Sequence, residues 1–354
     1  MKRVRVVIIA LLLLPAGCEG EYFLQLALGE LASLGNTVPV SEAIEDPRLT
    51  DDERAELVLT QEVRQFGVDQ IGLVAGDAYT LFEWNGTEPA GYALAASEKD
   101  SLTSYLWNLP FIGPTEVRFY FEEWMARQEA NRLAGLDYDV FLGQADGFST
   151  LGFFPDPVRQ SNLASMDEFD LAELILHEMT HSTVFKPTDA NFNESLATYV
   201  GRAAALSWFE HKFGAGSDIA QAASDRFADK AVIDDFVNDL YARMTQYYAD
   251  AAARGETREK IIAGREAEFD AARARYLTDF HPLLVDSERW AVIGEARFEN
   301  ATLLAGVRYQ ASLSDYEAVF DKLGGDFPAA LAVFSEAAAQ KDSRGYLRTW
   351  VQEH

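Results

Sequence analysis

The stretch His177-Glu178-Met179-Thr180-His181 has the H-E-x-x-H pattern of zinc hydrolases and is the most informative part of the sequence. On a helix, residues four apart lie one turn apart on the same face. Two imidazoles placed in this way can hold one zinc ion, each through a nitrogen at roughly 2.0–2.1 Å. Glu178 would then lie beside the open metal position as the general base of a zinc hydrolase. The pattern also arises by chance, and the alternative is a pair of core histidines on a buried helix.

The surrounding residues predict a helix for this motif. Ser165-Met166-Asp167-Glu168 has the spacing of a capping box, and acidic residues in the first turn suit the positive end of a helix dipole. Leucines and Ile175 supply an apolar side, and no Gly or Pro occurs before Pro187. We expect Pro187 to end this helix and a second helix to run from about Asn193 towards Phe213.

Glu194, at the start of the second predicted helix, is the best candidate for a third zinc ligand. A catalytic zinc typically takes three protein ligands and leaves one position for water, and a helix–turn–helix return would bring Glu194 opposite the two histidines. The alternative is a glutamate that only complements the helix dipole. His211, His281 and His354 stand alone in the sequence and are weaker candidates.

The first residues indicate where the protein works. Basic residues at 2, 3 and 5 precede a nine-residue apolar core, 6–14, which is too short to span a membrane and matches a secretory signal. Leu14-Pro15-Ala16-Gly17-Cys18 resembles a bacterial lipobox. We therefore expect residues 1–17 to be a lipoprotein signal peptide and Cys18 to be lipidated, with the protein anchored facing the periplasm or cell exterior. The alternative is ordinary cleavage nearby that leaves a free thiol.

The composition excludes several classes of partner. Cys18 is the single cysteine, so no intrachain disulfide forms, and a 354-residue chain with 48% hydrophobic residues can bury a large core instead. The formal charge of −27 argues against nucleic acid, because phosphate binding needs clustered Lys and Arg. It also disfavours anionic lipid headgroups, which leaves acyl chains as the anchor.

No linker, repeat or low-complexity tract divides the mature chain, so 18–354 is expected to be one domain. The expected fold class is α+β, predominantly helical and zincin-like. Residues 18–160 would hold a small sheet before the metal helix, and 161–354 would be helical. Helices are expected at 22–34, 40–44, 51–66, 121–133, 236–253, 257–277 and 314–323, and strands at 79–84, 92–96 and 138–142.

The chain resembles a family of predicted bacterial zinc aminopeptidases, lipoprotein-type members of the gluzincin group. In that family H-E-x-x-H is followed by N-E-S-x-A, which is Asn193-Glu194-Ser195-Leu196-Ala197 here. The resemblance continues in three other segments: Tyr22-Phe23-Leu24-Gln25 is similar to the opening Y-x-x-Q, 149–154 to an S-T-L-G-W-F strand, and Asn300-Ala301 with Tyr309 to an N-A…Y segment. These segments span almost all of the mature chain.

The resemblance implies further roles. Tyr309 would stabilise the tetrahedral oxyanion through its phenol, although a core or surface ring is the simpler interpretation. Zincins in general pair an edge strand with the substrate backbone, which would place Thr150 and Gly152 beside the substrate; an ordinary bulged strand is the alternative. No G-x-M-E-N segment, which holds a free amine in gluzincin aminopeptidases, precedes His177. Metallopeptidase is therefore better supported than aminopeptidase.

Two functions remain open from the sequence. The first is a zinc-dependent hydrolase acting on peptides outside the cytoplasm, with one Zn²⁺ per chain. The second is a non-catalytic lipoprotein with a structural zinc site. A structural zinc is usually closed by four ligands and needs no base, whereas this chain keeps Glu178 and offers no cysteine or nearby histidine as a fourth ligand. These features favour the hydrolase.

Overall fold

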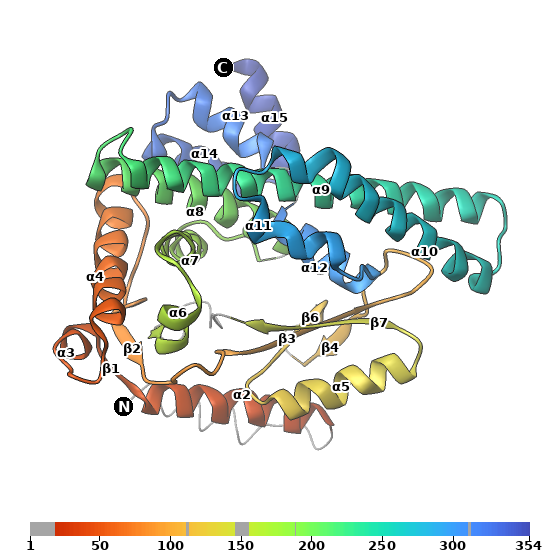
Figure 1. The fold of residues 1–354 in the computed structure, drawn as a ribbon, viewed down its shortest axis with the longest axis horizontal. Coiled ribbons are helices and arrows are strands. Elements are labelled where there is room, and N and C mark those ends of the chain that lie inside the picture. Colours follow the sequence, from red (N-terminus) through yellow and green to blue (C-terminus); the bar gives the residue numbers. More distant parts are fainter. Residues whose placement is uncertain (1–17, 111–112, 146–155, 188, 311–312) are drawn as a thin grey trace.

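Helices dominate the chain, and three small sheets lie among the described residues up to 159 (Figure 1). The computed structural model describes residues 18–110, 113–145, 156–187, 189–310 and 313–354. The predicted class, α+β and predominantly helical, is confirmed. None of the helices in these described ranges is long and apolar enough to cross a membrane.

The first part of the chain combines helices with short strands. Its helical elements are α2 (Cys18–Gly35), α3 (Val40–Ile44), α4 (Asp51–Phe66), the π-helical turn η1 (Gly67–Ile71) and α5 (Glu123–Gly135). Its strands are β1 (Thr37–Pro39), β2 (Leu81–Glu83), β3 (Gly91–Ser97), β4 (Trp107–Leu109), β5 (Gly113–Thr115), β6 (Val117–Tyr120), β7 (Asp139–Ala145) and β8 (Val158–Arg159).

The remainder is helical, as predicted. Its α-helices are α6 (Gln160–Ser165), α7 (Glu168–Thr183), α8 (Ala190–Phe213), α9 (Asp218–Ala253), α10 (Arg258–Arg275), α11 (Ser287–Trp290), α12 (Asn300–Gln310), α13 (Ser314–Lys322), α14 (Phe327–Ala338) and α15 (Ser343–Glu353). Shorter turns are the π-helical η2 (Tyr276–Phe280) and the 3₁₀ turns η3 (His281–Leu283) and η4 (Ala291–Glu295).

The sheets are built from strands that the sequence predicted only in part. One sheet has the order β1-β2-β8, a second has the antiparallel order β6-β3-β7, and β4 pairs with β5. The strands expected at 79–84, 92–96 and 138–142 correspond to β2, β3 and β7. The other five strands have two to four residues each, too few for alternation to be recognised.

The helix that carries the histidine motif begins differently from the prediction. The carboxylate of Asp167 accepts the backbone N–H of Asp170 at 3.0 Å and caps α7. The expected capping box from Ser165 is wrong, because Ser165 ends α6 and donates its hydroxyl to the Ser161 carbonyl at 2.8 Å. Helix α7 ends at Thr183, before Pro187.

The second helix also begins earlier than expected. Asp189 accepts the N–H of Phe192 at 3.0 Å, so α8 begins at Ala190 rather than near Asn193. Its end at Phe213 agrees with the prediction. Glu194 therefore lies in the second turn of α8, where its side chain can reach across to α7.

The sheet β6-β3-β7 has two different faces. Leu94, Ala96 and Leu142 belong to a core cluster with Tyr22 of α2 and Leu133 of α5. Figure 1 shows α2 and α5 beneath this sheet and α7 above it. The α7 side of the sheet faces the histidine motif.

Candidate active site

His177, His181 and Glu194 come together where α7 packs against α8. The Nε2 atoms of the two histidines are 3.1 Å apart. Oε2 of Glu194 lies 3.4 Å from Nε2 of His177 and 3.6 Å from Nε2 of His181. Three ligand atoms of a tetrahedral zinc, each roughly 2.0–2.1 Å from the metal, are separated by about 3.3–3.4 Å. Both the donor types and their spacing fit a zinc ion.

Electrostatics hold Glu194 in its charged form. Burial raises the pKa of its carboxyl, but the hydrogen bonds to His177 and His181 outweigh burial and lower the pKa to about 2. Burial lowers the pKa of His181, and Glu194, with the charge of Glu178, overcomes this and raises it. An ionised carboxylate against two imidazoles is the state that a metal ligand needs.

Glu178 lies beside His177 and His181, and its side chain lines a cleft. One of its carboxylate oxygens lies within 4.8 Å of a ring nitrogen of each histidine. The cleft has a volume of about 610 Å³ and lies between α7 and the sheet. Its walls include His177 and Glu178 from α7, and Ala93 and Phe141 from β3 and β7. A carboxylate that lies next to the two histidines and lines a cleft can accept a proton from a water molecule.

Basic residues balance the acids at one end of the cleft. The Nζ of Lys230, on α9, donates to Asp170 at 2.7 Å and also to Glu173. Arg202 of α8 donates through Nε to the same Glu173 at 3.1 Å and forms an ion pair with Asp234. Asp170 and Glu173 lie two turns and one turn before His177, so these contacts fix α7 against α8 and α9.

Gly201 is a site residue that the sequence prediction missed. A Cβ added to it would lie 3.2 Å from Cβ of His177 and 3.1 Å from the carbonyl oxygen of Glu173. Because the nearest atoms belong to the α7 backbone or its first side-chain atom, α8 approaches α7 closely only where no side chain intervenes. A single glycine within a predicted helix was the available signal.

Tyr79 was missed as well. It is 4% exposed and has a φ of 60°, held by its N–H, which donates to the Asp156 carbonyl at 2.7 Å, and by Gln61, which donates to its carbonyl at 2.8 Å. Burial and then the charge of Glu178 raise the pKa of its phenol well above the usual value. A protonated phenol therefore lies in the neighbourhood of Glu178. No local pattern marks this residue in the sequence.

The remaining predicted residues lie elsewhere or outside the described part. Thr150 and Gly152 lie outside the described residues, as do 1–17. The side chains of Cys18, the first residue of α2, and of Tyr309, in α12, also lie outside them. These roles stay predictions.

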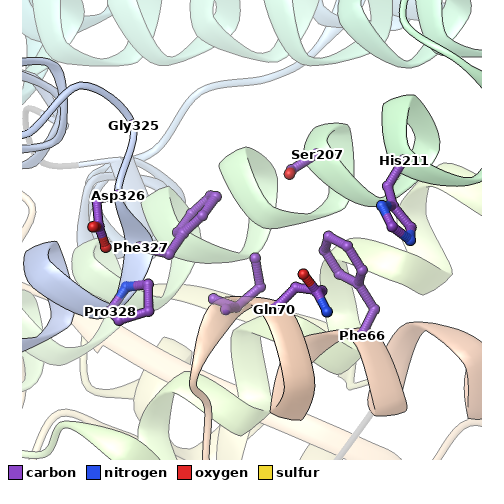
Figure 2. Close-up of a pocket in the computed structure, with 9 residues that line it drawn as sticks. Phe66, Gln70, Ser207, His211, Gly325, Asp326, Phe327 and Pro328 are labelled. Atoms are coloured by element: carbon purple, nitrogen blue, oxygen red, sulfur yellow. The ribbon is translucent and has the colours of Figure 1, made fainter.

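The other histidines take no part in the cluster. His211 lies with Phe66 at a separate pocket of about 350 Å³ between η1, α8 and the start of α14 (Figure 2). The ring of His281 contacts the Ser287 carbonyl at 3.1 Å, and His354 stacks on Trp350. The three histidines that the sequence made weaker candidates for a metal ligand therefore lie apart from His177 and His181.

Asn300, part of the segment that suggested the family resemblance, has a structural role. Its backbone N–H donates to Asp139 at 3.0 Å, and its side-chain amide donates to the Glu98 carbonyl at 2.9 Å. It is fully buried. The Asn300 contacts tie α12 to the sheet.

The site thus brings together a pair of histidines one turn apart, a glutamate from the next helix and a carboxylate that lines a cleft. Residues 21–345 match the model of a family described as "putative aminopeptidase". The chain belongs to this family, and its membership indicates a peptide hydrolase. No match was found among curated proteins or among solved structures.

Proposed function

We propose that the protein is a zinc-dependent peptide hydrolase. Zinc would be held by His177, His181 and Glu194, and Glu178 would act as the general base. The observation that carries this proposal is the mutual spacing of the three ligand atoms, 3.1 to 3.6 Å, beside a cleft. The family supports the reaction class.

Each residue would have a separate task. When bound, zinc supplies a water with a pKa near 7 and a Lewis acid for the scissile carbonyl. Glu178 would accept the proton of the attacking water and return it to the leaving amine. The two imidazoles and the ionised Glu194 would hold their positions through the contact between α7 and α8. The peptide would lie in the cleft between α7 and the sheet.

The specificity for a free N-terminus is a separate question. Among the described residues that line the cleft, the acids are Asp170, Glu173 and Glu178. The first two are already paired with Lys230, and Asp170 also with Arg289 at 2.9 Å. This arrangement gives no support to an amine pocket at that end of the cleft. We propose aminopeptidase activity on the family description alone. Assays with a library of peptides distinguish an aminopeptidase from an endopeptidase.

Glu178→Gln is the decisive variant, because it keeps the size of the side chain and all three proposed ligands. Zinc content and the melting temperature should match the parent, and peptide hydrolysis should fall by roughly 10²–10⁴-fold. His177→Ala is the control that should lose zinc and activity together, and His211→Ala should lose neither.

The assay uses peptides with free and blocked N-termini. Activity confined to free N-termini would establish an aminopeptidase, and cleavage of both classes would establish an endopeptidase. Hydrolysis that persists undiminished in Glu178→Gln would rule out the proposed base.

We also propose that the mature chain is an exported lipoprotein anchored through Cys18. The basis is the apolar core followed by a single cysteine. A bacterial host fed a fatty-acid analogue should label the parent, and Cys18→Ala should lose the label. A mature N-terminus at another residue, without lipid, would contradict this proposal.

A further inference from the structure

The outer face of α2 carries a stripe of exposed leucines. Leu24, Leu28 and Leu31 are 39%, 54% and 41% exposed. Their spacing of four and then three residues places them on one side of the helix. The other exposed residues within 20–35 of α2 are Glu21, Ala32 and Gly35. Among residues 20–35 of α2, whose side chains the structure describes, one exposed charged residue therefore accompanies the three leucines.

The opposite face of α2 is fixed to the sheet. Gln25 donates through Nε2 to the Phe119 carbonyl at 3.2 Å and accepts the Phe121 N–H at 3.0 Å. The ring of Tyr22 packs edge-on against Tyr120, with ring centroids 5.5 Å apart. These contacts prevent α2 from rotating its leucines inward. The leucines consequently face away from the sheet.

The position of the stripe in the chain points to its occupant. Helix α2 begins at Cys18, so a lipid attached there would leave from the first turn of this helix. Leu31 lies 13 residues further on, about 20 Å along the helix axis. A helix held to a membrane at one end and apolar along its outer side would bury that side at the boundary of headgroups and acyl chains.

The negative charge of α2 disfavours a membrane with anionic headgroups. The sequence of α2 contains glutamates and no Lys or Arg, and the whole chain carries a formal charge of −27. Attraction to anionic headgroups needs basic residues. The face therefore fits the apolar boundary of an uncharged or zwitterionic lipid layer.

We propose that α2 lies flat in the membrane surface, with Leu24, Leu28 and Leu31 inserted into the lipid. The location of this membrane rests on the lipid anchor proposed above, whereas the affinity of the leucine face for lipid does not require the anchor.

The leucine face and the cleft lie on opposite sides of the sheet β6-β3-β7. Tyr22 of α2 packs with Leu94 and Ala96 of β3, whereas Ala93 and Phe141, on the other face of the sheet, line the cleft. Side chains of neighbouring positions on a strand point to opposite faces. The sheet thus separates the membrane side from the cleft. The cleft therefore lies on the side of the sheet away from the lipid, where peptides in solution could reach it.

A single-label experiment tests the contact without any lipid anchor. The protein is the mature chain, residues 18–354, with Cys18→Ser, which has no other cysteine. Leu28→Cys then carries an environment-sensitive fluorophore, and vesicles of zwitterionic phosphatidylcholine are added. The emission at position 28 should shift to the blue and be quenched by a quencher in the acyl chains. The matched control is Leu283→Cys, at a residue that is 64% exposed in η3, whose emission should not change.

A partition measurement provides the second readout. Leu24, Leu28 and Leu31 together changed to Gln should lower vesicle binding by about tenfold or more, because three partly exposed leucines no longer leave water. The control, with Leu277, Leu283 and Val292 changed to Gln, should bind as the parent does. Both variants should keep the parental melting temperature and hydrolytic activity.

Three results would overturn the proposal: unchanged emission at position 28 in the presence of vesicles, equal loss of binding in both triple variants, or a blue shift that follows dimer formation in the absence of lipid. Failure of lipidation or of hydrolysis would leave these readouts unaffected, because the test protein carries no lipid and its activity is not the signal.

Discussion

Glu56 is a carboxylate placed where its charge is unfavourable. Its Oε2 is buried and has no hydrogen-bond partner among the described residues. Burial, followed by the charges of Asp52, Glu168 and Glu53, raises its pKa from 4.5 to about 7. The folded state therefore binds a proton more tightly than the unfolded state does. The stabilisation of the folded state by the proton on Glu56 is fully present below pH 4.5, and it is lost as the pH rises through about 7.

Glu56→Gln should therefore stabilise the protein at high pH and not at low pH. We expect the free energy of unfolding to rise by about 1 kcal/mol at pH 8. This is less than the full shift of the Glu56 pKa would give, because solvent screens a partly exposed group. Near pH 4.5 the change should vanish. Thermal or urea unfolding at both pH values provides the measurement, with Glu45→Gln as the exposed control. An equal effect at both pH values would show that the charge of Glu56 is not responsible.

At the scale of elements, the site depends on how closely α8 approaches α7. The two histidines belong to α7 and Glu194 to α8, so the spacing of the ligand atoms is set by the distance between helices. Gly201 lies two turns after Glu194 and directly against His177 and the Glu173 carbonyl. Ser195, next to Glu194, is tied to the C-terminal helices through Tyr316 at 3.0 Å and Arg344 at 2.7 Å.

Gly201→Ala should separate the helices and weaken the metal site. The added Cβ would press on backbone atoms that cannot rotate away, at a cost of about 1–3 kcal/mol, which outweighs the helix-propensity gain of about 1 kcal/mol. Zinc affinity should fall as well, because Glu194 moves with α8. The control is Gly135→Ala in α5, where a Cβ meets nothing within 4 Å. A Gly201→Ala protein with parental stability and zinc affinity would contradict the role assigned to this contact.

At the scale of the whole molecule, one buried ion pair joins the sheet to the helical part. Arg265 of α10 donates to Asp139, the first residue of β7, at 2.6 and 3.0 Å, and the two residues are each 3% exposed. Tyr248 of α9 donates to Asn300 at 2.9 Å, and Asn300 in turn donates to Asp139. Three helices thus converge on one carboxylate at the end of a strand.

Arg265→Met should be severely destabilising, by about 3–5 kcal/mol, because it leaves Asp139 charged and buried without its partner. Arg127→Met, which removes an exposed i,i+4 pair with Glu123, should change stability by no more than about 0.5 kcal/mol. Chemical unfolding of both variants gives the comparison. Adding Asp139→Asn to Arg265→Met should recover part of the loss, and no recovery would mean that the lost packing of the arginine matters more than the orphaned charge.

The sequence by itself predicted most of the helical part and named His177, His181 and Glu194 as the candidate metal ligands. Helix α4 has the predicted bounds, and its start is fixed locally by Thr50 and Glu53, which cap each other at 3.1 and 2.8 Å. The pairing of His177 with His181 follows from the pitch of one helix. Glu194 was found because a short turn returns the chain on itself. All of these features depend on residues close together in the sequence, where helical hydrogen bonds and capping act.

The tertiary structure alone decided the features that depend on distant segments. The approach at Gly201, the effect of the Glu178 charge on the pKa of Tyr79 and the pairing of Lys230 with Asp170 and Glu173 each join residues far apart in the chain. The outward direction of the leucines on α2 depends on which side of that helix the sheet occupies. Such contacts depend on packing across the whole core. A local sequence pattern therefore does not predict which distant residue each of these residues will contact.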